Sequence, residues 1–315
     1  MKKWFMSTVL AACLGSGSVA AEVGLYSLLA DDADARYPSH ADWQPELHRY
    51  QQEGFSTLYF TFIRPDTMSV PPAFTRLARS RGTNQPGAVP AGTRIIFAVG
   101  GIAYSTGINP WPWLTSPEAA RSMAQRVARW SHEHGADGID LDIEEGAGND
   151  RRAGKNLVEF VRELKRLNPN FLVTLPVYGY PQVDAANTLV NAAFGPDGTD
   201  YGLVDSIGIM VYEGTMALDY IGNYAKIPGK DRWEGFPIQA DVPKRKILLG
   251  LKGTASDATI RSMTTAVKAQ NLGGVMAWYG SVLHQGQKAL QYSTEWDSSR
   301  IQSGEWQQAK VQLSH

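Results

Sequence analysis

Hydrophobic and polar positions follow two different periods along this chain. Short apolar or β-branched runs, typical of buried strands, recur at residues 23–29, 57–63, 94–99, 137–144, 172–176, 206–211, 246–251 and 274–278. Stretches with the spacing of amphipathic helices lie between several of them, at residues 45–53, 72–80, 117–127, 157–167, 183–194, 216–224 and 257–270. Eight strands with eight connections favour an α/β fold, a single-domain (β/α)8 TIM barrel, over an open sheet.

The N-terminus has the three regions of a secretory signal peptide. Two lysines precede an apolar stretch at residues 4–14, and small residues follow up to Ala21. We therefore expect residues 1–21 to be removed, residues 22–315 to form the barrel domain, and the protein to be secreted or periplasmic. Residues 10–13 also resemble a lipoprotein cleavage box, so anchoring through Cys13 is the alternative. Cys13 is the one cysteine, which leaves a mature chain without disulfides.

The composition and net charge limit the kinds of molecule that we expect this protein to bind. The 315 residues are 43% apolar, enough for a large core, and 30 basic residues balance 31 acidic ones. A net charge of −1 gives no polyanion-binding surface, so we expect no nucleic-acid partner. No segment after the leader has the ~20 apolar residues of a transmembrane helix, and we expect a monomer.

The most informative stretch is residues 137–144. From position 140 on, every second residue carries a carboxylate, and these side chains share one face of an extended strand: Asp140, Asp142 and Glu144. The intervening positions are apolar, as in packed strands rather than in a solvated edge strand. Buried carboxylates raise one another's pKa, which keeps at least one of them protonated and able to donate a proton. This pattern predicts a general acid.

Further side chains are expected at the same end of the barrel. Active sites of TIM barrels lie where the strands end, and we place Glu144 last in its strand. Other strand ends supply Tyr178, Met210, Tyr212 and Trp278. Aromatic rings around a protonated carboxyl suit a sugar, and loop tryptophans are expected to extend the stacking surface: Trp111, Trp113 and Trp233.

These motifs carry a resemblance. Residues 137–144, DGIDLDIE, resemble the DGxDxDxE signature of family 18 glycoside hydrolases, the chitinases and endo-β-N-acetylglucosaminidases. Residues 99–101 resemble the SxGG segment of that family, residues 210–213 its MxYD segment, and Trp278 its strand-eight tryptophan. Val99 stands where we place the family's serine and Glu213 where it has aspartate. The resemblance spans residues 22–285.

The resemblance implies a retaining, substrate-assisted cleavage of β-1,4-linked N-acetylglucosamine polymers. It implies Glu144 as the acid and base, Asp142 as the partner of the 2-acetamido group, Asp140 as the group that shares a proton with Asp142, and Tyr212 as a donor to the acetamido oxygen. The expected substrate-binding residues are Trp278, Met210, Glu213, Tyr178 and Gly101. It implies no cofactor, and no His/Cys cluster suggests a metal.

Two alternatives share this signature. One is an endo-β-N-acetylglucosaminidase acting on N-glycans, and the other is a chitinase-like protein that binds oligosaccharides without cleaving them. A metal-dependent barrel enzyme would need ligands at several strand ends, which the histidines do not supply. The short connection between the last two predicted strands favours an open cleft and internal cleavage.

Overall fold

The computed structural model describes residues 21–28, 55–85, 88–105, 111–144, 150–234, 238–253, 255–281 and 305–313. The predicted helix at residues 45–53 and the leader with Cys13 lie outside these residues.

Eight parallel strands close into a barrel in the order of the sequence. The strands are β1 (Glu22–Leu28), β2 (Thr57–Ile63), β3 (Arg94–Gly100), β4 (Gly138–Asp142), β5 (Leu172–Tyr178), β6 (Ser206–Met210), β7 (Ile247–Lys252) and β8 (Gly274–Ser281). β1 pairs with both β2 and β8, which closes the ring and leaves no free sheet edge. The predicted (β/α)8 barrel is confirmed.

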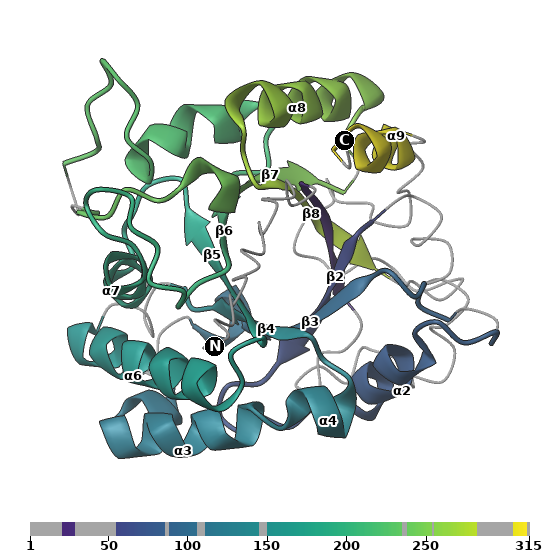
Figure 1. The fold of residues 1–315 in the computed structure, drawn as a ribbon, viewed down its shortest axis with the longest axis vertical. Helices are drawn as coiled ribbons and strands as arrows, with labels where there is room; N and C mark the ends of the chain where they lie inside the picture. Colours follow the sequence, from purple (N-terminus) through teal and green to yellow (C-terminus); the bar gives the residue numbers. More distant parts are fainter. Residues whose placement is uncertain are drawn as a thin grey trace, which may run out of the picture.

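Helices cover the outside of this ring (Figure 1). The α-helices are α2 (Pro72–Ser80), α3 (Pro117–Val127), α4 (Trp130–His134), α6 (Arg151–Leu167), α7 (Asp184–Ala193), α8 (Asp257–Gln270) and α9 (Glu305–Leu313), with the 3-10 helix η4 at Met216–Asn223. Sequence periodicity misses the short helix α4. α3 begins as expected, because the Ser116 side chain accepts a hydrogen bond from the N–H of Ala119. In the described part of the chain, no helix is long and apolar enough to cross a membrane.

The barrel has two separate apolar layers. Outward-facing strand residues pack against the helices and form the larger core. A smaller set fills the barrel interior: Tyr26, Tyr59, Ile96, Ala98, Leu248 and Met276. Because side chains alternate along each strand, the same strands that build the outer core direct every second residue to the interior and to its open end.

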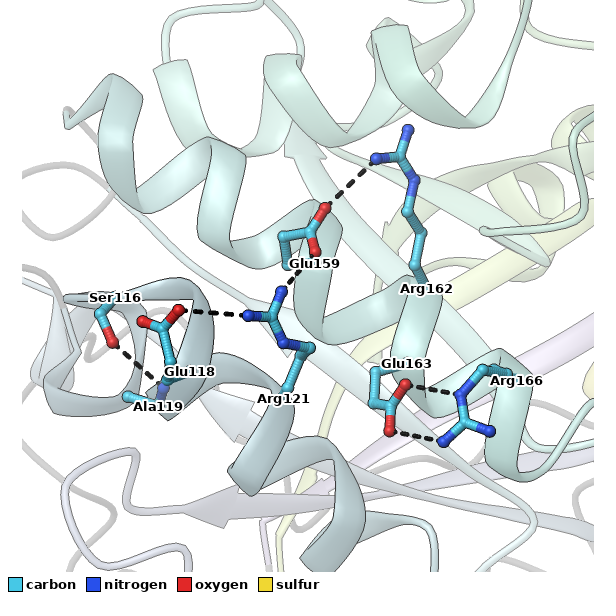
Figure 2. A network of polar contacts seen from close by, with 8 residues as sticks. All are labelled: Ser116, Glu118, Ala119, Arg121, Glu159, Arg162, Glu163 and Arg166. Atoms are coloured by element: carbon cyan, nitrogen blue, oxygen red, sulfur yellow. Dashed lines mark hydrogen bonds and ion pairs between the residues drawn. The ribbon is translucent and has the colours of Figure 1, made fainter.

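Ion pairs join the helices α3 and α6 on the outside of the barrel (Figure 2). Arg121 of α3 lies 2.9 Å from Glu159 of α6 and 3.2 Å from Glu118. Arg162 adds a contact to Glu159 at 3.3 Å. Exposed pairs of this kind contribute about 0–1 kcal/mol each. They explain the alternating charges of these helices as a solvated outer face.

Candidate functional site

The acidic strand β4 is fixed at both ends. At its start, Asp137 accepts hydrogen bonds from Arg81 and from the N–H of Ile95, which ties β4 to β3. At its end, the N–H of Gly101 donates to the carbonyl oxygen of Asp142 at 2.8 Å. Gly100 has φ +104°, and a Cβ there would overlap that carbonyl oxygen. The glycine pair is thus needed for the close approach that holds Asp142 in place.

Glu144 lies just beyond the strand. β4 ends at Asp142, so the expectation that Glu144 is the last strand residue is wrong. The N–H of Ile143 turns back to the carbonyl of Leu141 at 3.0 Å, and the N–H of Glu144 donates to Ser105 Oγ at 3.0 Å. A local turn and a side chain from the β3 connection therefore position this residue.

The carboxyl group of Glu144 is held by a neighbouring strand end. The Tyr178 hydroxyl donates to Glu144 Oε2 at 2.6 Å. Glu144 is only 8% exposed, Asp142 4% and Asp140 1%. Three adjacent carboxyl groups are thus nearly removed from water, which is costly unless they share protons or bind donors.

Asp140 is the deepest of the three carboxyl groups. The hydroxyl of Thr174 donates to its Oδ1 at 2.5 Å, and the hydroxyl of Tyr26 donates to its Oδ2 at 3.1 Å. Burial raises the pKa of Asp140 to about 7, although both hydrogen bonds act in the opposite direction.

Asp142 differs from Asp140 in its hydrogen bonding. Its Oδ1 is buried and has no hydrogen-bond partner within the described residues. Burial first, and then the charges of Glu144 and Asp140, raise the pKa of Asp142 well above its ordinary value. An unpaired buried acceptor is rare in proteins and costs free energy until a donor arrives. Asp142 is therefore ready to accept a hydrogen bond from a ligand.

Aromatic rings line the open end beside these carboxyl groups. Trp278 stacks with Tyr212 at 6.4 Å between ring centroids and contacts Tyr26 and Phe62, each at 5.7 Å. Burial and the charges of Asp142 and Glu144 raise the pKa of Tyr212, so its phenol stays protonated and remains a hydrogen-bond donor. The predicted residues Tyr178, Tyr212 and Trp278 are thus brought together with the acidic ones.

The other predicted residues have more specific surroundings. Met210 ends β6 and packs against the interior cluster. Glu213 forms an ion pair with Lys252 of β7 at 2.6 Å. Gly101 has φ +84°, and its N–H is used by Asp142, so Gly101 shapes the backbone of the site. Direct substrate contact by these three residues stays a prediction.

Two of the three predicted stacking tryptophans are buried. Trp111 is 2% exposed and packs against Gly100, whereas Trp113 is 4% exposed and donates from Nε1 to the carbonyl of Pro65. The expectation that they stack on a sugar is wrong, because both rings lie in the core between the strands and α6. Both tryptophans are ordinary core residues, and the sequence alone did not distinguish a buried tryptophan from one that stacks on a ligand.

Trp233 belongs instead to a half-exposed aromatic cluster with Tyr180 and Tyr220. Tyr180 lies 5.3 Å from Trp233 and 5.0 Å from Tyr220 between ring centroids. Asn223 holds the cluster at the end of β5 by donating to the carbonyl of Gly179 at 2.8 Å. We call these three rings the β5–β6 platform.

Sequence reasoning missed the groups that surround Asp140. Tyr26 and Thr174 occupy inward positions of β1 and β5, and the two-residue alternation of those strands is the signal that could have identified them. The serine position of the SxGG pattern is also Ala98 rather than Val99. Ala98 is in register with Asp140 and faces the interior, whereas Val99 packs in the outer core.

The arrangement can perform proton transfer beside a sugar-sized aromatic floor. It offers one carboxyl group bound by Tyr178, a second with an acceptor oxygen that has no partner among the described residues, and a third that accepts hydrogen bonds from Thr174 and Tyr26. Within the described ranges, no group of three His, Cys, Asp or Glu side chains is arranged to hold a metal ion.

The chain has a (β/α)8 barrel that is similar to the barrels of family 18 chitinases. It resembles a GH18 chitinase from Pseudoalteromonas aurantia with a TM-score of 0.58 and 15% identity over 93% of this chain and 100% of that one. A GH18 chitinase from the chitin utilization locus of Flavobacterium johnsoniae gives 0.58 and 16% identity over 94% of each chain.

A third similar structure includes a ligand. A GH18 chitinase mutant from Cycas revoluta, in complex with (GlcNAc)4, gives a TM-score of 0.56 and 14% identity over 93% of this chain and 99% of that one. No family model and no curated protein matches the sequence. At these identities the likeness establishes the fold, and the chemistry must be argued from the residues.

Proposed function

We propose that this protein is a glycoside hydrolase that cleaves β-1,4-linked N-acetylglucosamine chains, chitin or its oligomers, with retention of configuration. One observation carries the proposal: Oδ1 of Asp142 is buried without a hydrogen-bond partner among the described residues, and the charge of Glu144 acts on the same carboxyl group. A 2-acetamido N–H is the donor that this oxygen lacks. The barrel of the chitinases, and the GlcNAc oligomer bound to one of them, support the same substrate class.

In the first step, the Glu144 carboxyl protonates the glycosidic oxygen, and the C1–O bond to the leaving sugar breaks. The acetamido oxygen of the same sugar forms the new bond to C1, which gives an oxazolinium-like intermediate. Asp142 accepts the acetamido N–H and balances the developing positive charge. The Tyr212 phenol donates to the acetamido group, and Trp278 supports the sugar ring.

In the second step, the Glu144 carboxylate removes a proton from water. The water oxygen bonds to C1, and the bond between C1 and the acetamido oxygen breaks. Two displacements at C1 return the starting configuration. No group outside the protein, the substrate and water is needed for this balance.

Product analysis by mass spectrometry tests this function. The protein is offered N-acetylglucosamine oligomers and, separately, a high-mannose glycoprotein. Cleavage of the oligomers supports the proposal, whereas release of whole glycans in its place would identify an endo-β-N-acetylglucosaminidase. Binding of oligomers without cleavage would identify a chitinase-like binding protein.

The position of the β5–β6 platform suggests where the leaving part of the sugar chain binds. Trp278 lies on β8, and Tyr180 follows β5, nearly opposite in the barrel order. Glu144 and its partner Tyr178 lie on the same side as the platform. If the reacting sugar lies over Trp278, the sugars beyond the cleaved bond pass Glu144 and reach Tyr180, which is 47% exposed.

Replacing Tyr180 by alanine should therefore slow the cleavage of long substrates more than that of short ones. Loss of ring stacking should lower kcat/KM for the N-acetylglucosamine pentamer by about 5-fold, since an aromatic contact contributes about 0.5–1.5 kcal/mol. A chitobioside with a nitrophenol leaving group does not reach the platform and should change less than about 2-fold.

The matched control is Tyr201→Ala. Tyr201 is 58% exposed and lies before the first residue of β6, at the amino ends of the strands, whereas the platform lies at their carboxyl ends. This variant should leave both substrates unaffected. An equal loss on both substrates in Tyr180→Ala, or no loss on the pentamer, would remove the platform from the substrate path.

We also propose that the protein is exported. The first residue of β1 is Glu22, and the N–H of Ala21 pairs with the carbonyl of Leu313 at 2.9 Å. This fits removal of the leader close to that point. Mass spectrometry of the N-terminal peptide from expressing bacterial cells should find a start at Ala21 or Glu22. An acylated peptide beginning at Cys13 would instead establish a lipoprotein.

A further inference from the structure

The last two interior positions of β7 both lie beside the segment that carries Tyr212. Leu248 faces the barrel interior and Leu251 packs in the outer core, so the alternation of β7 directs Gly250 and Lys252 to the interior as well. The Tyr212 ring packs directly against Gly250, because a Cβ at that position would lie 3.0 Å from two carbons of the ring. β7 therefore supports the ring from the side of the next strand.

The backbone of Tyr212 lies beyond the regular sheet. β6 ends at Met210, and its pairing with β7 ends one residue earlier, at Ile209 with Leu249. Tyr212 and Glu213 follow the last described strand pairs on both sides of β6. Outside the ladder of backbone hydrogen bonds, a segment keeps its orientation through turns and side-chain contacts.

Lys252 supplies such a contact. Its Nζ lies 2.6 Å from Oε1 of Glu213, the residue that follows Tyr212. The lysine side chain is 21% exposed and the glutamate side chain 62%, so the glutamate reaches the lysine from the solvent side. Lys252 is in register with Trp278 of β8, and the N–H of Gly253 donates to the carbonyl of Trp278 at 2.9 Å. Lys252 thus connects the segment of Tyr212 to the strand of Trp278.

We propose that Lys252 is a positioning residue that, through Glu213, holds the Tyr212 phenol at a fixed distance from the Trp278 ring. The inference rests on the proposed function for its catalytic consequence, since the phenol must meet the acetamido group of a sugar that lies over Trp278. It gives Glu213 the role of a partner to Lys252 in place of a contact to the substrate. A partly exposed ion pair adds little to the stability of a fold, so its effect is on the geometry of the site.

The first test follows the environment of Tyr212 directly. The protein is labelled with 3-fluorotyrosine, and the ¹⁹F signal of Tyr212 is assigned by its loss in Tyr212→Phe. In Lys252→Met, which keeps an unbranched side chain and removes the charge, this signal should move and broaden. In Lys252→Arg it should stay in place, because a guanidinium can still pair with Glu213. An unchanged signal in Lys252→Met, or equal changes in both variants, would overturn the proposal.

Turnover of the N-acetylglucosamine pentamer supplies the second readout. In Lys252→Met, kcat should fall about 5-fold while KM changes less than about 2-fold, and Lys252→Arg should restore kcat. In a Tyr212→Phe background, Lys252→Met should lower kcat by less than about 1.5-fold, because residues that act as a unit are not additive. The full loss in that background would show that Lys252 acts on the substrate without Tyr212, and this would overturn the positioning role.

Two further variants complete the experiment. Glu213→Gln removes the same ion pair from its exposed side and should reproduce the change in the Tyr212 signal, whereas an unchanged signal would contradict the proposal. Arg129→Met is the control, because it removes an exposed ion pair on the outside of the barrel, to Glu133 at 3.0 Å. It should change neither the ¹⁹F signal of Tyr212 nor the turnover.

The two proposals fail separately. If wild-type protein cleaves no oligomer, the proposed function is wrong, and the ¹⁹F signal still decides whether Lys252 positions Tyr212. If wild-type protein cleaves oligomers and the signal is unaffected by Lys252→Met, only the role of Lys252 is wrong.

Discussion

Replacement of Glu144 by glutamine should lower kcat for N-acetylglucosamine oligomers by about 1000-fold. A positioned general acid contributes about 100- to 10,000-fold, and a carboxamide of the same shape cannot supply the proton. KM should change little, because the aromatic floor and Asp142 remain. The rate is measured on the pentamer near pH 6 by quantifying the released oligomers.

Folding should be unaffected by this change. Glutamine can still accept the hydrogen bond from Tyr178, so the melting temperature should stay within about 3 °C of wild type. Glu133→Gln provides the matched control, since Glu133 lies on α4 outside the barrel. Wild-type turnover in Glu144→Gln would show that another group is the acid.

Replacement of Asp142 by asparagine should produce the second-largest loss, about 100-fold in kcat. The amide can present an oxygen to the acetamido N–H, yet it can neither become negative nor share a proton with Asp140. A stable analogue of the oxazoline intermediate is the sharper probe. Its inhibition constant should increase about 10- to 100-fold, because a charge-assisted hydrogen bond is lost.

Asp197→Asn is the matched control for that experiment, because Asp197 lies in an exposed turn between α7 and β6. It should leave the rate and the inhibition constant unchanged. Full activity of Asp142→Asn, with undiminished binding of the analogue, would argue against participation of the acetamido group.

The fold follows from local patterns in the sequence. Eight apolar runs predict eight strands, and all eight are present, because buried parallel strands need apolar residues on their outer face. One error at the site is the end of β4. The Ile139-Leu141-Ile143 alternation continues past Asp142, but Ser105 captures the N–H of Glu144 from a different connection. A contact between residues 39 positions apart leaves no local signal.

Burial of single aromatic residues was harder to predict. Trp111 and Trp113 occur in a Pro- and Trp-containing segment that resembles an exposed loop, yet Trp113 packs on Phe160 of α6 at 4.7 Å between ring centroids. Trp233 has similar sequence surroundings and lies in the half-exposed platform. Whether such a tryptophan is buried or half-exposed depends on which helix packs over its segment, and this is decided by the tertiary structure.

The polar partners of Asp140 were missed for a related reason. Thr174 and Tyr26 occur in strands whose composition is ordinary for buried β structure, and nothing in either strand identifies an acidic neighbour. Only the barrel closure brings β1 beside β8 and places its interior face opposite β4. The acidic signature therefore identifies the carboxyl groups of β4, whereas the hydroxyl groups that bind Asp140 become apparent only in the assembled barrel.

The most direct test is ¹H NMR of the new reducing end during the first minutes of hydrolysis of the N-acetylglucosamine pentamer. Retention through the acetamido group predicts that the β-anomer appears first and then equilibrates with the α-anomer. Initial release of the α-anomer, or no release of product from this substrate, would contradict a retaining chitin-type hydrolase built on Asp142 and Glu144.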